Sequence, residues 1–115
     1  MDAATVRAML EQHFTSGDPD LSHEMYDEDA VVEFRQSGER FVGVENLREW
    51  RSNYPASVTV EFREVRGSGE FWVAEILITY DDDPPNLGIS ILELRDGKIA
   101  ERRAWVIELK ENDYR

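Results

Sequence analysis

Hydrophobic residues at the start of the chain recur at the spacing of an amphipathic helix. The positions i, i+3, i+4, i+7 and i+8 of the stretch from Asp2 to Phe14 are held by Val6, Met9, Leu10, His13 and Phe14. Either Asp2 or Thr5 can cap this helix, and a Ser-Gly pair at 16–17 ends it. Asp18-Pro19 is typical of the start of a second helix, which three acidic residues at 27–29 should end.

The stretch from residue 29 to residue 55 predicts a hairpin followed by a third helix. Residues 31–34 have the β-branched and aromatic side chains of a strand, and residues 36–39 have the chemistry of a turn. The third helix ends before Pro55, because the residue preceding a proline is disfavoured in the α region. The apolar face of this helix is formed by Leu47, Trp50 and Tyr54.

From residue 57 onward the hydrophobic period changes from that of a helix to the alternation of strands. The four strands expected run from residue 57 to a turn at 67–69, over Phe71–Tyr80, over Leu87–Arg95 and over Lys98–Leu109. The strand at 71–80 is apolar on both faces apart from Glu75, so we expect it to be central. Helices followed by antiparallel strands indicate an α+β architecture with the helices on one face of the sheet.

Composition narrows the classes of function. A chain of 115 residues suits a single domain over residues 1–115, and no apolar run reaches the roughly 20 residues of a membrane helix. The net charge of −12 disfavours binding to nucleic acid or to an anionic membrane. There is no cysteine, and neither histidine has metal-ligand spacing to an acidic residue. We therefore expect a cytoplasmic protein that uses no metal and no cofactor.

Four short segments carry a family resemblance: Tyr26–Val32, Ser37–Gly43, Leu47–Pro55 and the turn Asp96–Ile99. They resemble the SnoaL-like (polyketide cyclase-like) branch of the nuclear-transport-factor-2-like superfamily. The resemblance implies a cone-shaped, cystatin-like fold, in which a curved antiparallel sheet wraps around the N-terminal helices and leaves a pocket, usually in a homodimer. Because this fold hosts isomerases, cyclases, epoxide hydrolases, dehydratases and binding modules, the resemblance specifies no reaction.

The catalytic positions that the resemblance implies hold uncharged residues in this chain. The general-base aspartate of ketosteroid-isomerase-like members corresponds to Phe34, and their oxyanion tyrosine corresponds to Leu10. Their oxyanion aspartate corresponds to Ser90, and the aspartate of polyketide cyclases corresponds to Ala104. The chain therefore departs from each catalytic pattern that we can match, which favours binding over catalysis.

Three polar residues remain as candidates for chemistry. Alternation along the strands places Glu75 and Arg102 on the same inward face, and a buried carboxylate costs several kcal/mol unless it is paired. Glu75 is then either a polar anchor or general base whose charge Arg102 fixes, or half of a structural ion pair. His13 lies on the apolar side of the first helix, as a second candidate for proton transfer or as a hydrogen-bonded core residue.

The leading interpretation is a SnoaL-like protein that binds a small hydrophobic molecule in a cone-shaped pocket. The residues expected to bind the ligand are Arg102, Phe14, Phe34, Trp50, Tyr54 and Leu77. The alternatives are an isomerase, cyclase or lyase that uses Glu75 or His13, and a protein-interaction module. A cavity with a polar group favours the first two interpretations, and a filled interior favours the third.

The opposite face of the sheet should carry two tryptophans, Trp72 and Trp105. A monomer that left this much aromatic surface in water would be unusual. We therefore expect a homodimer that forms through this face.

Overall fold

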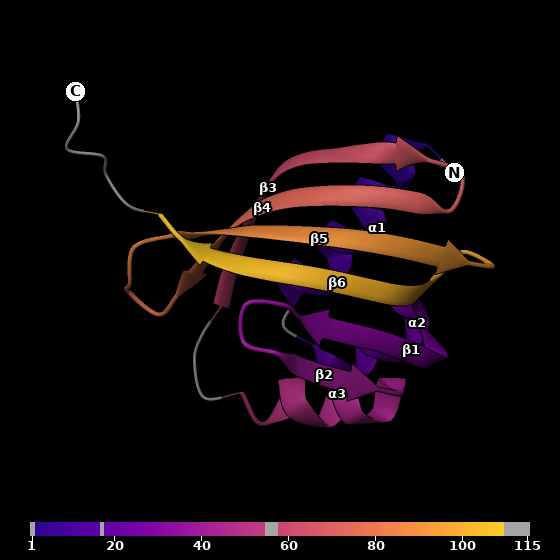
Figure 1. Cartoon of the computed structure of the whole chain (residues 1–115), viewed down its shortest axis with the longest axis horizontal. Coiled ribbons are helices and arrows are strands. Elements are labelled where there is room, and N and C mark those ends of the chain that lie inside the picture. The colour runs from indigo at the N-terminus through magenta and orange to yellow at the C-terminus, as the bar shows by residue number, and fades with distance from the viewer. Residues whose placement is uncertain (1, 17, 55–57, 110–115) are drawn as a thin grey trace.

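Six strands form one curved sheet, and helices cover one of its faces (Figure 1). The computed structural model describes residues 2–16, 18–54 and 58–109. The helical elements are α1 (Ala3–Ser16), the 3₁₀ turn η1 (Pro19–Leu21), α2 (Ser22–Met25) and α3 (Val44–Ser52). The strands are β1 (Tyr26–Phe34), β2 (Glu39–Val42), β3 (Val58–Ser68), β4 (Phe71–Tyr80), β5 (Asn86–Arg95) and β6 (Lys98–Glu108). The expected α+β class is confirmed.

The strands are arranged in the order β2-β1-β6-β5-β4-β3. The hairpins β1–β2, β3–β4, β4–β5 and β5–β6 are antiparallel, as expected. β1 and β6, from the two ends of the sheet-forming sequence, lie side by side and are parallel. This pairing joins the β1–β2 hairpin to the four-stranded meander, so that a single sheet can curve around the helices.

The N-terminal elements differ from the expectation in one segment. Asp2 caps α1, because its Oδ1 accepts a hydrogen bond of 2.8 Å from the backbone N–H of Thr5. The second helix is only the 3₁₀ turn η1 followed by the single turn α2. The acidic residues 27–29, expected to follow it, lie instead within β1, where Asp27 pairs with Arg95 at 3.1 Å.

The inner face of β4 is the opposite of the one we expected. Trp72, Ala74, Ile76 and Ile78 are buried beneath the helices, whereas Glu75 is exposed on the outer face. Because β4 is apolar on both faces, alternation alone does not select one, and the expected register is wrong by one residue. The observed register buries the indole of Trp72 and leaves the carboxylate of Glu75 in water, which is the lower-energy choice.

One polar contact joins α1 to the sheet, and another joins α3 to η1. Arg7 of α1 donates a hydrogen bond of 2.9 Å to the carbonyl of Phe62 in β3. Arg48 of α3 pairs with Asp20 of η1 at 2.7 Å, which joins α3 to the N-terminal segment.

Within the described part of the chain, no helix has the length and apolar character to cross a membrane.

Candidate functional site

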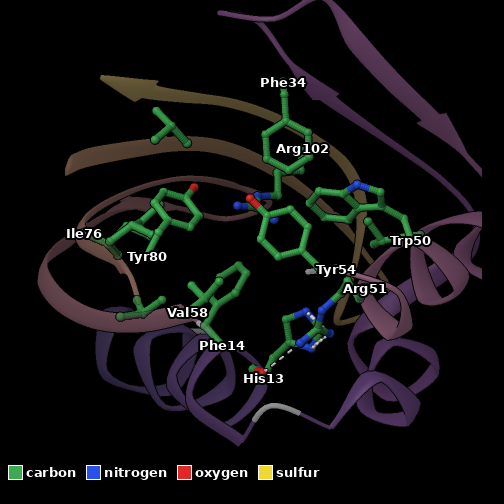
Figure 2. A pocket seen from close by; sticks show the side chains of 14 residues that line it. His13, Phe14, Phe34, Trp50, Arg51, Tyr54, Val58, Ile76, Tyr80 and Arg102 are labelled. Carbon is green, nitrogen blue, oxygen red and sulfur yellow. Dashed lines mark hydrogen bonds between the residues drawn. The ribbon is translucent and has the colours of Figure 1, made fainter. Parts of the chain in front are cut away.

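A cavity of ≈ 420 Å³ lies between α1, α3 and the inner face of the sheet (Figure 2). This volume falls within the roughly 300–1,000 Å³ typical of small-molecule sites. Its lining residues are His13, Phe14, Phe34, Leu47, Trp50, Arg51, Tyr54, Val58, Val60, Ile76, Ile78, Tyr80, Arg102 and Val106. Tyr54 and Val58 are the most exposed of them, at 38% and 42%, and mark the mouth.

Aromatic rings form one wall of the cavity. The ring of Trp50 lies 5.3 Å from that of Phe34 and 5.1 Å from that of Tyr54. Phe41 supports Trp50 from behind at 5.0 Å, and Tyr80 continues the wall at 6.3 Å from Tyr54. Tilted and edge-on rings at these distances pack favourably, so the wall is a formed surface for an apolar ligand.

Arg102 provides the polar end of the cavity. It is only 7% exposed. Its Nε donates a hydrogen bond of 3.0 Å to Ser90 Oγ, and its Nη1 donates one of 3.1 Å to the hydroxyl of Tyr26. The guanidinium carbon also lies 4.7 Å from the ring centre of Phe14 and 5.6 Å from that of Phe34. Arg102 is thus held by hydroxyls and aromatic faces rather than by a carboxylate.

Two of the predicted site residues do not reach the cavity. Glu75 lies on the outer face of β4, opposite Ile89 of β5, so the expected ion pair with Arg102 is wrong. Leu77 has the same orientation and is not a lining residue. Both errors follow from the register of β4, since a slip of one residue moves every side chain to the other face.

His13 is buried at the helical wall of the cavity, where it is 2% exposed. Nη1 of Arg51 lies 2.9 Å from its Nε2 and 3.1 Å from its Nδ1, and the ring contacts Phe14 and Tyr26 edge-on. Burial, together with the positive charges of Arg51 and Arg102, lowers the pKa of His13 to about 2. The imidazole is therefore neutral near pH 7 and accepts a hydrogen bond from Arg51, and it is a weak base.

The buried neutral imidazole makes stability depend on pH. The pKa of His13 is about 2 in the folded state, against 6.5 for an unperturbed histidine, so the unfolded chain takes up the proton first as the pH falls. The free energy of unfolding should then decrease below pH 6.5, by up to about 1.4 kcal/mol per pH unit from this residue. Urea titrations between pH 6.5 and pH 5 measure the slope, and the variant His13→Gln should have a shallower one. Equal slopes in the two proteins would contradict the buried neutral imidazole.

The structure brings five of the predicted lining residues together and adds two polar ones. Phe14, Phe34, Trp50, Tyr54 and Arg102 all line the cavity. Arg51 and Tyr80 do so as well, although neither was predicted from the sequence. Arg51 is four residues after Leu47, a spacing that places both on one helical face. Tyr80 continues the alternation of Ile76 and Ile78. With the correct register of β4, the sequence would have predicted Tyr80 on the inner face.

The four positions that the sequence resemblance matched to catalytic groups hold no charged side chain. Leu10 is fully buried, and Phe34 is part of the aromatic wall. Ser90 and Ala104 are paired across β5 and β6, on the inner face of the sheet. Among the described lining residues there is no aspartate or glutamate, and the described residues contain no cluster of three or more His, Cys, Asp or Glu side chains that could hold a metal ion.

The sequence and the fold identify the family. The family model described as a SnoaL-like domain matches residues 6–102, so the chain belongs to this family, with an NTF2-like fold. An NTF-2 like protein of unknown function from Burkholderia xenovorans is 33% identical, with a TM-score of 0.84 over 96% of this chain and 89% of that chain. No match was found among curated proteins.

Two more distant structures share the fold. A protein from Kribbella flavida, provisionally assigned as a ketosteroid isomerase, is 21% identical, with a TM-score of 0.79 over 96% of this chain and 84% of that chain. A hypothetical protein from Catenulispora acidiphila, with a ketosteroid isomerase-like fold, was solved in complex with trimethylamine. It is 15% identical, with a TM-score of 0.71 over 86% of this chain and 82% of that chain. At these identities the similarity concerns the fold and not the activity.

Proposed function

We propose that the chain binds a small, largely hydrophobic molecule in the cavity between its helices and its sheet. The observation that carries this proposal is a cavity of ≈ 420 Å³ whose walls are mainly aromatic and aliphatic and whose inner end is polar. Apolar walls supply binding free energy, and a few fixed polar groups orient the ligand. A protein-interaction module would not need such a cavity, so we prefer a binding protein to that alternative.

Binding is also favoured over catalysis. An isomerase, cyclase or lyase needs a proton-transfer group whose pKa lies near the working pH. Glu75 is on the outer face of the sheet, and His13 has a pKa of about 2 and is hydrogen-bonded to Arg51. Neither of the two candidates that the sequence offered for proton transfer therefore suits the enzymatic alternative.

Blocking the cavity should abolish binding of an apolar probe. We expect the neutral dye N-phenyl-1-naphthylamine to bind the protein with a rise in fluorescence, and the variant Val60→Trp, which places an indole in the cavity, to bind at least tenfold more weakly. The matched control is Thr59→Trp, one residue earlier on β3, where the side chain is exposed. A protein that does not bind the dye, or equal binding by both variants, would contradict the proposal.

We further propose that a second copy of the chain covers the outer face of the sheet. Trp105 lies on this face, but Trp72 does not, because it is buried in the core with its Nε1 donating to the carbonyl of Gly69 at 2.9 Å. Apolar side chains form neighbouring rows across the outer face of β4, β5 and β6: Phe71, Val73, Leu77, Leu87, Ile89, Ile91, Trp105 and Ile107. A contiguous apolar surface of this kind is typical of an interface.

A charged substitution on this surface should dissociate the dimer. We expect the wild type to sediment at twice its 13.4 kDa mass, and Ile89→Asp, at the centre of the rows, to sediment as a monomer. Because each copy has a net charge of −12, the wild-type dimer should also tighten as salt screens the repulsion. Ala8→Asp makes the same charge change at an exposed site on α1 and should remain dimeric. A monomeric wild type at micromolar concentration would contradict this proposal.

A further inference from the structure

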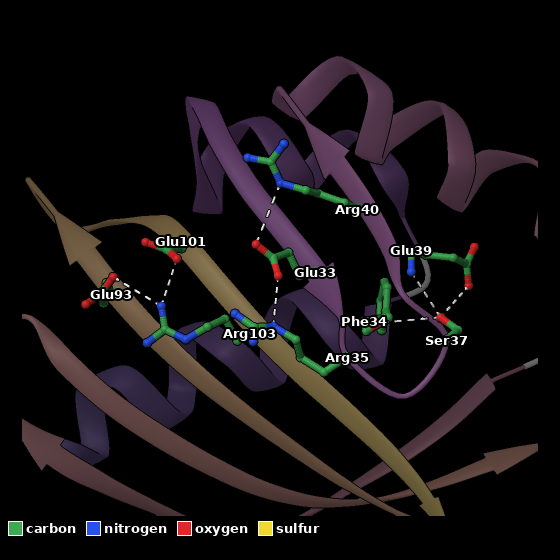
Figure 3. A network of polar contacts seen from close by, with 9 residues as sticks. All are labelled: Glu33, Phe34, Arg35, Ser37, Glu39, Arg40, Glu93, Glu101 and Arg103. Atoms are coloured by element: carbon green, nitrogen blue, oxygen red, sulfur yellow. Dashed lines mark hydrogen bonds and ion pairs between the residues drawn. The ribbon is translucent and has the colours of Figure 1, made fainter.

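Among the described residues, Arg102 has no carboxylate partner, whereas neighbouring arginines of the sheet do. Arg103, the next residue, pairs with Glu101 at 2.8 Å and with Glu93 at 3.5 Å on the outer face (Figure 3). Arg35 pairs with Glu33 at 2.8 Å on the same face. The chain has 25 acidic residues, yet none of those that the structure describes forms an ion pair with Arg102. A buried cation without a counter-charge is unfavourable, so a ligand that brings a negative charge into the cavity would be stabilised there.

The guanidinium of Arg102 still has donors to offer. Of its five N–H groups, one on Nε and one on Nη1 are used by the neutral hydroxyls of Ser90 and Tyr26. Nη2 forms no hydrogen bond with a described residue. No side-chain nitrogen or oxygen in the described part of the chain is both fully inaccessible and without a hydrogen-bond partner, so Nη2 is at least partly accessible. Because Arg102 lines the cavity, we infer that Nη2 faces it. Figure 2 shows the guanidinium pointing into the space between Phe34, Tyr54 and Tyr80.

A second cation, Arg51, adds to the positive charge of Arg102 in the cavity. Arg51 lines the same cavity, and burial and the charge of Arg102 lower its pKa, although Tyr26 and Asp18 act in the opposite direction. His13 is kept neutral by its burial and by the same two guanidinium groups. The described lining residues include no acid, although the chain as a whole has a net charge of −12. The cavity is thus an electropositive site within an acidic protein.

We propose that the ligand of this cavity is an organic anion, namely a small carboxylate with an aromatic or aliphatic body. Its head group accepts hydrogen bonds from Arg102, and its body packs against the wall formed by Phe34, Trp50 and Tyr54. A carboxylate fits the planar fork of a guanidinium, and its single charge neutralises a cation that forms no ion pair with any acid the structure describes. The inference rests on the proposed function, because it requires that the cavity binds a ligand at all.

A pair of matched probes tests the charge of the ligand. Naphthalene-2-carboxylate and naphthalene-2-carboxamide have the same ring body and nearly the same shape, but only the first is an anion at pH 7.5. We expect calorimetry or displacement of the neutral dye to show that the wild type binds the carboxylate at least tenfold more tightly, as hydrogen bonds to charged groups predict. A preference below about threefold would overturn the inference, and this comparison needs no variant.

Substitutions then locate the preference. Arg102→Met keeps the unbranched apolar stem but removes the charged guanidinium, so it should weaken carboxylate binding far more than amide binding and remove the preference for the carboxylate. Arg102→Lys should keep part of the preference, since it retains the charge without the fork. Arg103→Met, on the outer face, is the matched control and should behave as the wild type. A preference that survives Arg102→Met would also overturn the inference.

The outcomes separate the two proposals. In one outcome, the neutral dye binds and Val60→Trp blocks it, while the carboxylate and the amide bind equally well. This result would show that the cavity is a binding site and would overturn the inference that its ligand is an anion. In that case Arg102 is a core residue that its hydroxyl and aromatic neighbours satisfy. If neither the dye nor either naphthalene probe binds, the proposed function fails and the inference fails with it.

Discussion

Replacing Trp72 with alanine should destabilise the protein by about 3–5 kcal/mol, the range found for large aromatic residues in a core. Trp72 is 2% exposed and is the largest of the fully buried side chains. Its indole N–H donates to the carbonyl of Gly69, and the substitution also removes this hydrogen bond. Such a loss is a large part of the free energy of unfolding of a typical domain, which is roughly 5–15 kcal/mol. Urea unfolding followed by far-UV circular dichroism, at one fixed protein concentration, measures it.

The matched control for this prediction is Glu75→Ala. Glu75 lies three residues further along the same strand, and its side chain is exposed in a single copy of the chain. Because the proposed dimer would cover it, both substitutions are compared in the monomeric Ile89→Asp background. Substitutions at such sites usually change stability by about 0.5 kcal/mol or less. The opposite ranking, with a large loss for Glu75→Ala and a small one for Trp72→Ala, would mean that β4 has the register predicted from the sequence and not the register of the structure.

The order of elements could be predicted from the sequence, because it depends on local signals. The periodicity of residues 2–14, the turn at 96–97 and the alternation after residue 57 each predicted an element that the structure contains. The parallel pairing of β1 with β6 joins segments far apart in the chain, and no local pattern specifies it. The acidic residues 27–29 were misplaced for a similar reason, since a backbone pairing partner can extend a strand through charged residues that alternation would exclude.

The candidate site could be predicted where an element has one apolar face and not where it has two. On α3, the helical spacing of Leu47 and Trp50 selected the face that lines the cavity. On β6, Arg102 and Ala104 have the inward orientation that alternation gave them. On β4, both faces are apolar, so the choice between Trp72 and Glu75 depended on the helices packed above the strand. That choice decided whether Arg102 has a carboxylate partner, which is why the expected ion pair failed.

The same hairpin that holds Trp72 should be intolerant of a methyl group at Gly67. A Cβ on Gly67 would lie 2.1 Å from the carbonyl oxygen of Phe71 and 2.8 Å from Cα of Trp72. Both atoms belong to the backbone of the paired strand, which cannot move aside as a flexible side chain can. Gly67 also has a φ of 155°, which an alanine adopts only with strain. We expect Gly67→Ala to cost about 3 kcal/mol, the upper end of the range for overpacking.

Gly69→Ala in the same hairpin separates crowding from backbone conformation. Gly69 has a φ of 58°, so an alanine there must adopt a left-handed conformation, which costs at least about 1 kcal/mol. Its Cβ would meet no atom within 4 Å, so it causes no crowding. If crowding against β4 is the cause, Gly67→Ala is the more destabilising of the two, and its near-UV circular dichroism changes because the indole of Trp72 lies against the glycine. Equal losses would show that conformation alone governs this turn. The folded fraction of either variant should bind the probes as the wild type does, because the hairpin is at the opposite end of β4 from Tyr80 at the cavity.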